Sequence, residues 1–159
     1  MKIAARKQIG VIGAGVCGSE SRAVAEAVGR EVAKRGAVLL CGGLGRVMEA
    51  AAYGAKQEGG ITLGILPGTL REEANLWIDI AVVSGMGHAR NALIAQSSDA
   101  LIAVSGEYGT LSEIALGLKM RKPVVVLEPG WKIEGVHRAK SPEEAVELVF
   151  SLIEGDEKS

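Results

Sequence analysis

The sequence predicts a doubly wound α/β domain, in which a parallel sheet carries helices on both faces. Short apolar runs alternate with longer runs of helical periodicity along the chain, and this alternation is typical of parallel sheets. The runs expected as strands are apolar throughout, as strands covered on both faces should be. Glycine accounts for 22 of the 159 residues and stands mainly at the ends of the apolar runs.

The chain opens with a strand, a helix and a second strand. The first apolar run, 8–12, stops at Gly13. Apolar residues at helical spacing follow over 19–35, and Gly36 ends this expected helix, as a glycine just past the last turn should. The second strand is expected over 37–41, before a pair of glycines.

The middle of the chain continues the alternation. An alanine-rich helix is expected over 46–58, and Gly59 ends it. The third strand, 61–66, stops at a Pro-Gly pair, which is a turn signal. Residues 69–76 are expected to form a loop or a single helical turn, and the apolar run 78–83 a fourth strand.

The second half repeats the pattern of strands and helices. A helix is expected over 89–97, followed by the fifth strand over 100–104. The next helix is expected over 110–120 and the sixth strand over 124–127. The sheet of six or seven strands is expected to have the order 3-2-1-4-5-6, with its switch point between strands 1 and 4.

The last helix has a strong start signal. Ser141 is expected to cap it, with proline in the first helical position and glutamate in the third. This helix is expected to end near residue 153. We therefore expect one domain over 1–153 and a charged, frayed tail over 154–159.

Composition excludes several functional classes. Hydrophobic residues make up 48% and charged residues 23%, which excludes a disordered chain. Aromatic residues make up 3% and the net charge is -1, so neither nucleic acid nor a membrane surface is an expected partner. Two cysteines, Cys17 and Cys41, do not form a secreted disulfide framework, and no signal-peptide pattern precedes the first strand. We expect a cytoplasmic protein.

Four glycine-bearing turns follow strands 1, 2, 4 and 5, at the edge where such sheets bind ligands. Each leads into a helix N-terminus, whose unpaired N–H groups and positive dipole can hold a phosphate. Tight turns need glycine in any case, but four around one switch point favour a phosphate-bearing ligand. The candidate ligand-binding residues in these turns are Gly13, Gly15, Gly18, Ser19, Gly42, Gly43, Gly45, Arg46, Gly85, Met86, Gly106, Glu107, Tyr108, Gly109 and Thr110.

The first turn matches the dinucleotide fingerprint G-x-G-x-x-G over 13–18. That fingerprint also needs an acidic residue at the end of the second strand to hold the ribose. No acid stands there, since the strand ends at Cys41 and Gly42. A mononucleotide or sugar phosphate is therefore favoured over NAD as the ligand. Since aromatic residues are scarce, Tyr108 is the ring best placed to stack on a base. The Cys and His residues lack metal-site spacing, so no metal is expected.

Residues 109–113 (GTLSE), with 87–91 (GHARN) before them, resemble the signature of the LOG superfamily. These Rossmann-type proteins are cytokinin-activating phosphoribohydrolases, long mislabelled as lysine decarboxylases. The short chain, 66–69 (LPGT), 73–75 (EAN) and the Ser112-Glu113 pairing are more similar to the molybdenum-cofactor carrier branch. The resemblance covers about 8–128 and implies a Rossmann-like fold.

The resemblance also implies site residues and an activity. LOG hydrolases cleave the N-glycosidic bond of a nucleoside 5'-monophosphate to a base and ribose 5-phosphate. Carried over, Arg90 would stabilise negative charge on the ligand, and Glu113 would support an oxocarbenium-like centre or activate water. The carrier branch implies a molybdopterin-type ligand, with no cofactor required for the protein itself. It further implies a homo-oligomer, a dimer or tetramer, for which the helices 46–58 and 110–120 would suit close packing.

Two positions depart from the LOG motif. Ser105-Gly106-Glu107 replaces Pro-Gly-Gly, and Asn91 replaces a lysine after the motif arginine. Both changes make the phosphate end of the site less positive. We therefore expect a carrier-like protein that binds a phosphorylated nucleotide-like ligand. The alternatives are a LOG-type phosphoribohydrolase, in which Arg90 and Glu113 are catalytic, and a nucleotide-sensing oligomer without chemistry.

Two features of the motif have a structural alternative. Thr110 and Glu113 have the spacing of a capping box, in which they would satisfy backbone donors at the start of a helix. Arg90 would alternatively pair with Asp99 or Glu113 on the surface.

Overall fold

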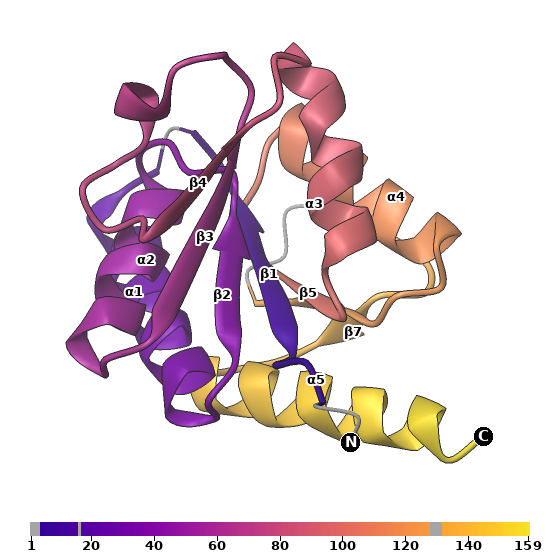
Figure 1. Cartoon of the computed structure of the whole chain (residues 1–159). Coiled ribbons are helices and arrows are strands. Elements are labelled where there is room, and N and C mark those ends of the chain that lie inside the picture. Colours follow the sequence, from indigo (N-terminus) through magenta and orange to yellow (C-terminus); the bar gives the residue numbers. More distant parts are fainter. Residues whose placement is uncertain (1–3, 16, 128–131) are drawn as a thin grey trace.

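The computed structural model describes residues 4–15, 17–127 and 132–159, whose strands form one seven-stranded parallel sheet (Figure 1). The strands are β1 (Gln8–Gly13), β2 (Val38–Cys41), β3 (Ile61–Leu66), β4 (Ile80–Val83), β5 (Ala100–Val104), β6 (Val124–Val126) and β7 (His137–Arg138). The helices are α1 (Ser19–Lys34), α2 (Val47–Gln57), α3 (Asn91–Ser97), α4 (Tyr108–Lys119) and α5 (Pro142–Glu157), with 3-10 turns η1 (Arg71–Glu73) and η2 (Gly87–Arg90). The expected α/β fold with a parallel sheet is confirmed.

Helices cover both faces of the sheet, as the apolar strands predict. Helices α1, α2 and α5 bury Val28, Ala51 and Val149 in one core, against Val11 and Ile102 of the strands. Helices α3 and α4 contribute to the second core on the opposite face. In the described part of the chain, no helix is long and apolar enough to cross a membrane.

The strand order is 4-3-2-1-5-6-7, so the expected order 3-2-1-4-5-6 is wrong for the fourth strand. β4 lies at the edge beside β3, with Leu63 opposite Ile80. β5 takes the place next to β1 instead. The switch point therefore lies between β1 and β5, and the chain crosses to the other half of the sheet one strand later than expected.

Polar contacts just before β4 explain why it stays beside β3. The Asp79 carboxylate accepts a hydrogen bond from the Thr62 backbone N–H at 2.9 Å. The Asp79 backbone N–H in turn donates to the Thr62 carbonyl at 3.1 Å, and Lys56 of α2 pairs with the Asp79 carboxylate at 2.9 Å. These contacts fix the start of β4 on the open edge of β3, which gives Asp79 a structural role.

The start of α5 agrees with its expected position, whereas its end and the start of α4 do not. Ser141 caps α5, since its Oγ accepts from the Glu144 backbone N–H at 3.1 Å. α5 continues beyond residue 153 to Glu157, which pairs with Lys7 before β1, so most of the expected frayed tail is helical. α4 begins at Tyr108, two residues earlier than expected, with Glu107 as its N-cap.

Helices α1 and α2 approach each other at glycines. A Cβ at Gly29 of α1 would overlap the backbone carbonyl of Ala51, and one at Gly54 of α2 would overlap that of Glu26. The alanine-rich face of α2 is thus used inside the chain, against α1.

Substitution of Gly54 by alanine is expected to destabilise the protein by about 1–3 kcal/mol, the usual cost of overpacking a tight contact. Gly155→Ala in α5 is the matched control, because a Cβ there meets nothing within 4 Å. Alanine is a better helix former than glycine, so the control should gain roughly 0.5–1 kcal/mol. Urea denaturation measures both free energies of unfolding. Equal stabilities of the two variants would contradict this packing.

Candidate functional site

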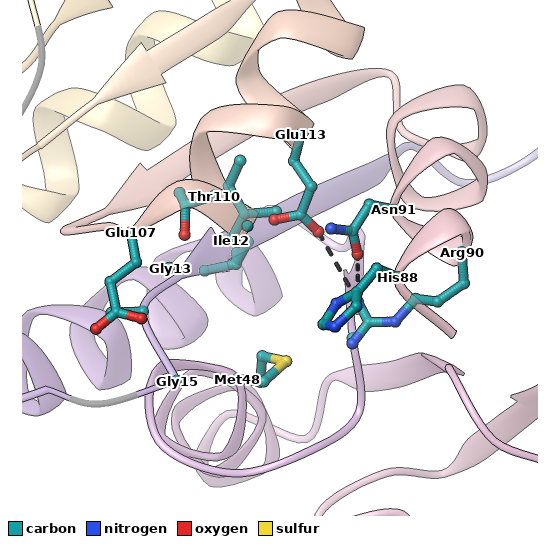
Figure 2. Close-up of a pocket in the computed structure, with 14 residues that line it drawn as sticks. Ile12, Gly13, Gly15, Met48, His88, Arg90, Asn91, Glu107, Thr110 and Glu113 are labelled. Carbon is teal, nitrogen blue, oxygen red and sulfur yellow. Dashed lines mark hydrogen bonds and ion pairs between the residues drawn. The ribbon is translucent and has the colours of Figure 1, made fainter. Parts of the chain in front are cut away.

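A pocket opens at the carboxyl edge of the sheet, at the ends of the neighbouring strands β1 and β5 (Figure 2). The chain leaves these two strands toward helices on opposite faces of the sheet. It has a volume of about 530 Å³ including its open mouth, which falls within the usual range for ligand sites. The lining residues come from the ends of β1 and β2 and from α2, η2, α3 and α4. They are Val11, Ile12, Gly13, Ala14, Gly15, Gly42, Met48, His88, Arg90, Asn91, Glu107, Gly109, Thr110 and Glu113.

Arg90 ends the η2 turn and is only 8% exposed. Its guanidinium lies against the turn that follows β2. A Cβ at Gly42 would come within 2.5 Å of Arg90 Nη1 and 2.6 Å of Met48 Sδ. A larger residue after β2 would therefore displace the Arg90 guanidinium and the Met48 thioether from their places beside the pocket.

Side-chain contacts hold the Arg90 guanidinium in place from α3 and α4. Arg90 Nη1 donates to Asn91 Oδ1 at 3.0 Å, and Asn91 Nδ2 donates to Ser112 Oγ at 3.2 Å. Ser112 Oγ donates to the Gly109 carbonyl in the first turn of α4 at 2.6 Å. Asn91, which replaces the motif lysine, thus connects Arg90 to the helix that carries the rest of the motif.

Glu113 faces Arg90 from α4. Its Oε1 lies 3.9 Å from Arg90 Nη1, and the residue is only 6% exposed. Burial raises the pKa of Glu113 to about 7, against the weaker opposing effect of the Arg90 charge. Burial likewise lowers the pKa of Arg90, and Glu113 opposes that shift. The carboxyl of Glu113 is thus poised to exchange a proton near neutral pH, beside a buried cation.

The Arg90 guanidinium keeps an unused donor. Its Nε is buried and has no hydrogen-bond partner among the described residues. Ser105 Oγ, at the end of β5, is also buried without such a partner. A buried cationic N–H without an acceptor carries a free-energy cost, so the burial of this guanidinium is only partly compensated by its neighbours.

Helices α1 and α4 both begin at this edge without a side-chain cap. Gly18 precedes α1 and Glu107 precedes α4, and neither makes a side-chain cap hydrogen bond. Backbone N–H groups in such first turns are suited to phosphate oxygens. The Glu107 carboxylate lies across the pocket from His88 and Arg90 (Figure 2). A ligand therefore meets positive charge on one side and negative charge on the other.

The structure brings about half of the sequence-predicted site residues together. Gly13, Gly15, Gly42, Arg90, Glu107, Gly109, Thr110 and Glu113 line the pocket. Gly106 and Tyr108 instead border a neighbouring hollow, together with Glu107 and Gly109. Gly18, Ser19, Gly43, Gly45, Arg46, Gly85 and Met86 do not belong to the lining.

Gly43 and Gly85 have roles in the chain turns instead. Gly43 has a positive φ and packs against Gly64 of β3, while its carbonyl accepts from the Asn75 backbone N–H. Gly85 also has a positive φ, and its N–H donates to the Gly68 carbonyl. At both positions the turn itself requires glycine.

Sequence reasoning did not select the pocket residues Val11, Ile12, Ala14, Met48, His88 and Asn91 as ligand contacts. Met48 and His88 each follow a glycine turn closely, which is the signal that identifies them in retrospect. The capping-box interpretation of Thr110 and Glu113 is wrong. α4 begins at Tyr108, so Glu113 lies in its second turn and faces Arg90. Of the two alternative partners for Arg90, the structure shows Glu113, in a buried rather than a surface position, whereas the Asp99 carboxylate accepts from the Gln8 backbone N–H.

The two cysteines belong to the same core. Cys41 is fully buried, and burial raises the pKa of its thiol to about 11. Cys17 is half-buried and packs against that core, and both thiols are free. Across the residues that the structure describes, no three His, Cys, Asp or Glu side chains gather as metal ligands would.

The fold and the Gly-Thr-x-x-Glu helix start with its facing arginine define a LOG-type Rossmann protein, close to molybdenum-cofactor carriers. The chain belongs to the SLOG cluster4 family, whose model matches residues 6–152.

The chain is similar in sequence to an archaeal protein and to phosphoribohydrolases. An uncharacterized protein of Archaeoglobus fulgidus is 51% identical over 144 residues, which is 91% of this chain and 95% of that one. The cytokinin riboside 5'-monophosphate phosphoribohydrolase of Mycobacterium tuberculosis is 35% identical over 71% of this chain and 65% of its own length. The chain thus spans just under two thirds of that hydrolase.

Solved structures of molybdenum-cofactor proteins match nearly the whole chain. The molybdenum cofactor binding protein of Rippkaea orientalis has a TM-score of 0.89 and 39% identity, over 94% of this chain and 98% of that one. The molybdenum cofactor carrier protein of Chlamydomonas reinhardtii has a TM-score of 0.85 and 36% identity, over 94% and 99%.

The pKa of Glu113 makes stability depend on pH. Between its ordinary value of 4.5 and about 7 the folded chain holds a proton that the unfolded chain releases, so stability falls as the pH rises through that window. The full effect amounts to about 3 kcal/mol. Glu113→Gln should lack this loss and gain stability relative to wild type above neutral pH.

Denaturation of both proteins across that pH window measures the effect. The exposed Glu154→Gln is the control and should follow the wild type. Parallel pH profiles for wild type and Glu113→Gln would show that the carboxyl titrates normally.

Proposed function

We propose that this protein binds a phosphorylated nucleotide-like small molecule in the pocket at the β1–β5 switch point, as a carrier rather than as a catalyst. The observation that carries the proposal is the buried Arg90 guanidinium, whose Nε has no acceptor in the described part of the chain. A phosphate or another anionic oxygen in the pocket, which Arg90 lines, would pair with this guanidinium. The likeness to proteins named as binding or carrying the molybdenum cofactor supports a pterin-type cargo of this chemistry.

Charge in the pocket favours binding over hydrolysis. Glu107 lines the wall opposite Arg90, where the LOG motif has an uncharged glycine. Asn91 stands in place of a lysine and is occupied in holding Arg90. A nucleoside monophosphate with a compact dianionic phosphate therefore meets less positive charge here than the motif provides, and its transition state is stabilised less.

Neutralising Arg90 should weaken ligand binding strongly. In calorimetric titrations with AMP and with the isolated molybdenum cofactor, Arg90→Gln should lower the affinity for any ligand that wild type binds by tenfold or more, since charge-assisted hydrogen bonds contribute about 1.5–3 kcal/mol. Arg6→Gln, which removes an exposed positive charge before β1, is the matched control and should bind as wild type does. Unchanged affinity of Arg90→Gln would contradict the proposal.

A phosphoribohydrolase is the second candidate, and the position of Glu113 favours it. Its carboxyl has a pKa of about 7 and lies 3.9 Å from Arg90, an arrangement suited to a general acid or base at neutral pH. The identity to a cytokinin riboside 5'-monophosphate phosphoribohydrolase supports this candidate as well.

Incubation with a panel of nucleoside 5'-monophosphates separates the two candidates. The carrier proposal predicts binding without release of ribose 5-phosphate, measured by chromatography of the products. Steady release that Glu113→Gln abolishes would instead establish hydrolysis. Asp99→Asn is the control, since Asp99 lies outside the pocket.

A further inference from the structure

The Glu107 carboxylate is a feature of the pocket that phosphate binding does not explain. Glu107 is exposed at the start of α4 and makes no side-chain cap hydrogen bond. Glutamate is not among the residues that favour the N-cap position, so helix capping does not account for it. The helix dipole attracts the negative charge but does not occupy the carboxylate oxygens. Both oxygens are therefore available to a ligand.

The backbone around Glu107 is held in place by its neighbours. Ser105 has a φ of 53°, in the left-handed region that residues other than glycine seldom adopt, and such strain is typical of binding sites. A Cβ at Gly106 would come within 2.9 Å of the Thr110 side chain, so the loop packs directly on the first turn of α4. The Glu107 carbonyl accepts from the Leu111 N–H at 3.0 Å. These contacts fix the wall from which the carboxylate projects.

Glu107 lies where two hollows meet. It lines the pocket on the wall opposite Arg90 (Figure 2). The neighbouring hollow, which 106–109 line, shares Glu107 and Gly109 with the pocket. A ligand that extends from Arg90 toward the second hollow and Tyr108 passes the Glu107 carboxylate. The pocket thus offers a cation to one end of such a ligand and a carboxylate to the other end.

A carboxylate accepts hydrogen bonds through two oxygens and donates none. A group with two adjacent N–H donors matches both oxygens in a bidentate pair, as the guanidinium of arginine does in proteins. A heterocycle with a 2-amino group beside a ring N–H has such an edge, and guanine and pterins share it. Adenine instead presents a ring nitrogen acceptor beside its amino group. One carboxylate oxygen would then face a lone pair, which is unfavourable.

We propose that Glu107 recognises the 2-amino-4-oxo edge of the ligand's heterocycle, so that the site prefers guanine-type or pterin-type ligands to adenine-type ones. The inference rests on the proposed function, because a phosphate at Arg90 orients the ligand in the pocket. It assigns the choice of heterocycle to Glu107 and the affinity common to all phosphorylated ligands to Arg90. The LOG motif has glycine in place of Glu107, and glycine has no side-chain acceptor for this edge.

Calorimetric titrations with GMP, IMP and AMP test the preference. These nucleotides share the same ribose phosphate, so they differ only in the edge of the base. Wild type should bind GMP about tenfold more tightly than AMP or better, since a bidentate charge-assisted pair is lost with adenine. IMP, which keeps the ring N–H but lacks the amino group, should fall in between. EDTA in the buffer excludes a metal ion that would bridge the carboxylate and the phosphate.

The isolated molybdenum cofactor is the fourth ligand, because its pterin carries the same edge. Tighter binding of the cofactor than of GMP would assign the edge to a pterin, and the reverse order would assign it to a guanine nucleotide. Either order supports recognition by Glu107, provided that Glu107→Gln weakens the binding of both ligands.

Glu107→Gln should abolish or reverse the preference for GMP over AMP. A glutamine amide both donates and accepts, so it matches the adenine edge better than the guanine edge. The affinity for GMP should fall about tenfold while that for AMP stays or rises. Glu143→Gln is the matched control and should keep the wild-type preference. It removes an exposed carboxylate from the first turn of α5, outside the pocket lining.

The outcomes separate this inference from the proposed function. Equal affinities of wild type for GMP and AMP, both lowered by Arg90→Gln, would overturn the role of Glu107 and leave the proposed function standing. A preference for GMP that Glu107→Gln retains in full would do the same. Absence of binding by all four ligands would overturn both proposals.

Discussion

Burial of the Arg90 guanidinium at the carboxyl edge of the sheet is the constraint on which the site depends. A charge removed from water is costly unless other groups compensate it. Here the compensation is partial: Asn91 accepts one hydrogen bond, Glu113 lies at ion-pair distance, and Nε has no acceptor among the described residues. An arginine held in this way is preorganised for an anion, since little of its side-chain entropy remains to be lost on binding.

Several residues from separate segments of the chain position the Arg90 guanidinium. Gly42 leaves the space that the guanidinium occupies. Asn91 and Ser112 connect it to the first turn of α4, and the parallel topology brings the ends of β1 and β5 together beside it. The arginine and Glu113 are also coupled, because each shifts the pKa of the other. An anion bound to Arg90 would repel the Glu113 carboxylate and favour its protonated form, so binding and proton uptake are linked.

Local pattern predicted most of the fold, whereas the central pair of the site, Arg90 and Glu113, was predicted through the resemblance to the LOG motif. The alternation of apolar runs predicts the parallel sheet, and the Ser141 cap predicts the start of α5, because both depend on neighbouring residues alone. The place of β4 could not be predicted in this way. Ile80 and Val82 have the composition of a buried strand, and their edge position is set by the contacts of Asp79 with Thr62 and Lys56, which join distant segments. The same limit applies to Met48 and His88, since only the assembled edge shows that they line the pocket.

The pairing of Arg90 with a phosphate is the central claim, and a crystal structure of the protein with bound AMP or molybdenum cofactor tests it most directly. The account predicts a phosphate oxygen within hydrogen-bond distance of the Arg90 guanidinium, between the first turns of α1 and α4. A ligand phosphate bound away from the Arg90 guanidinium would contradict it.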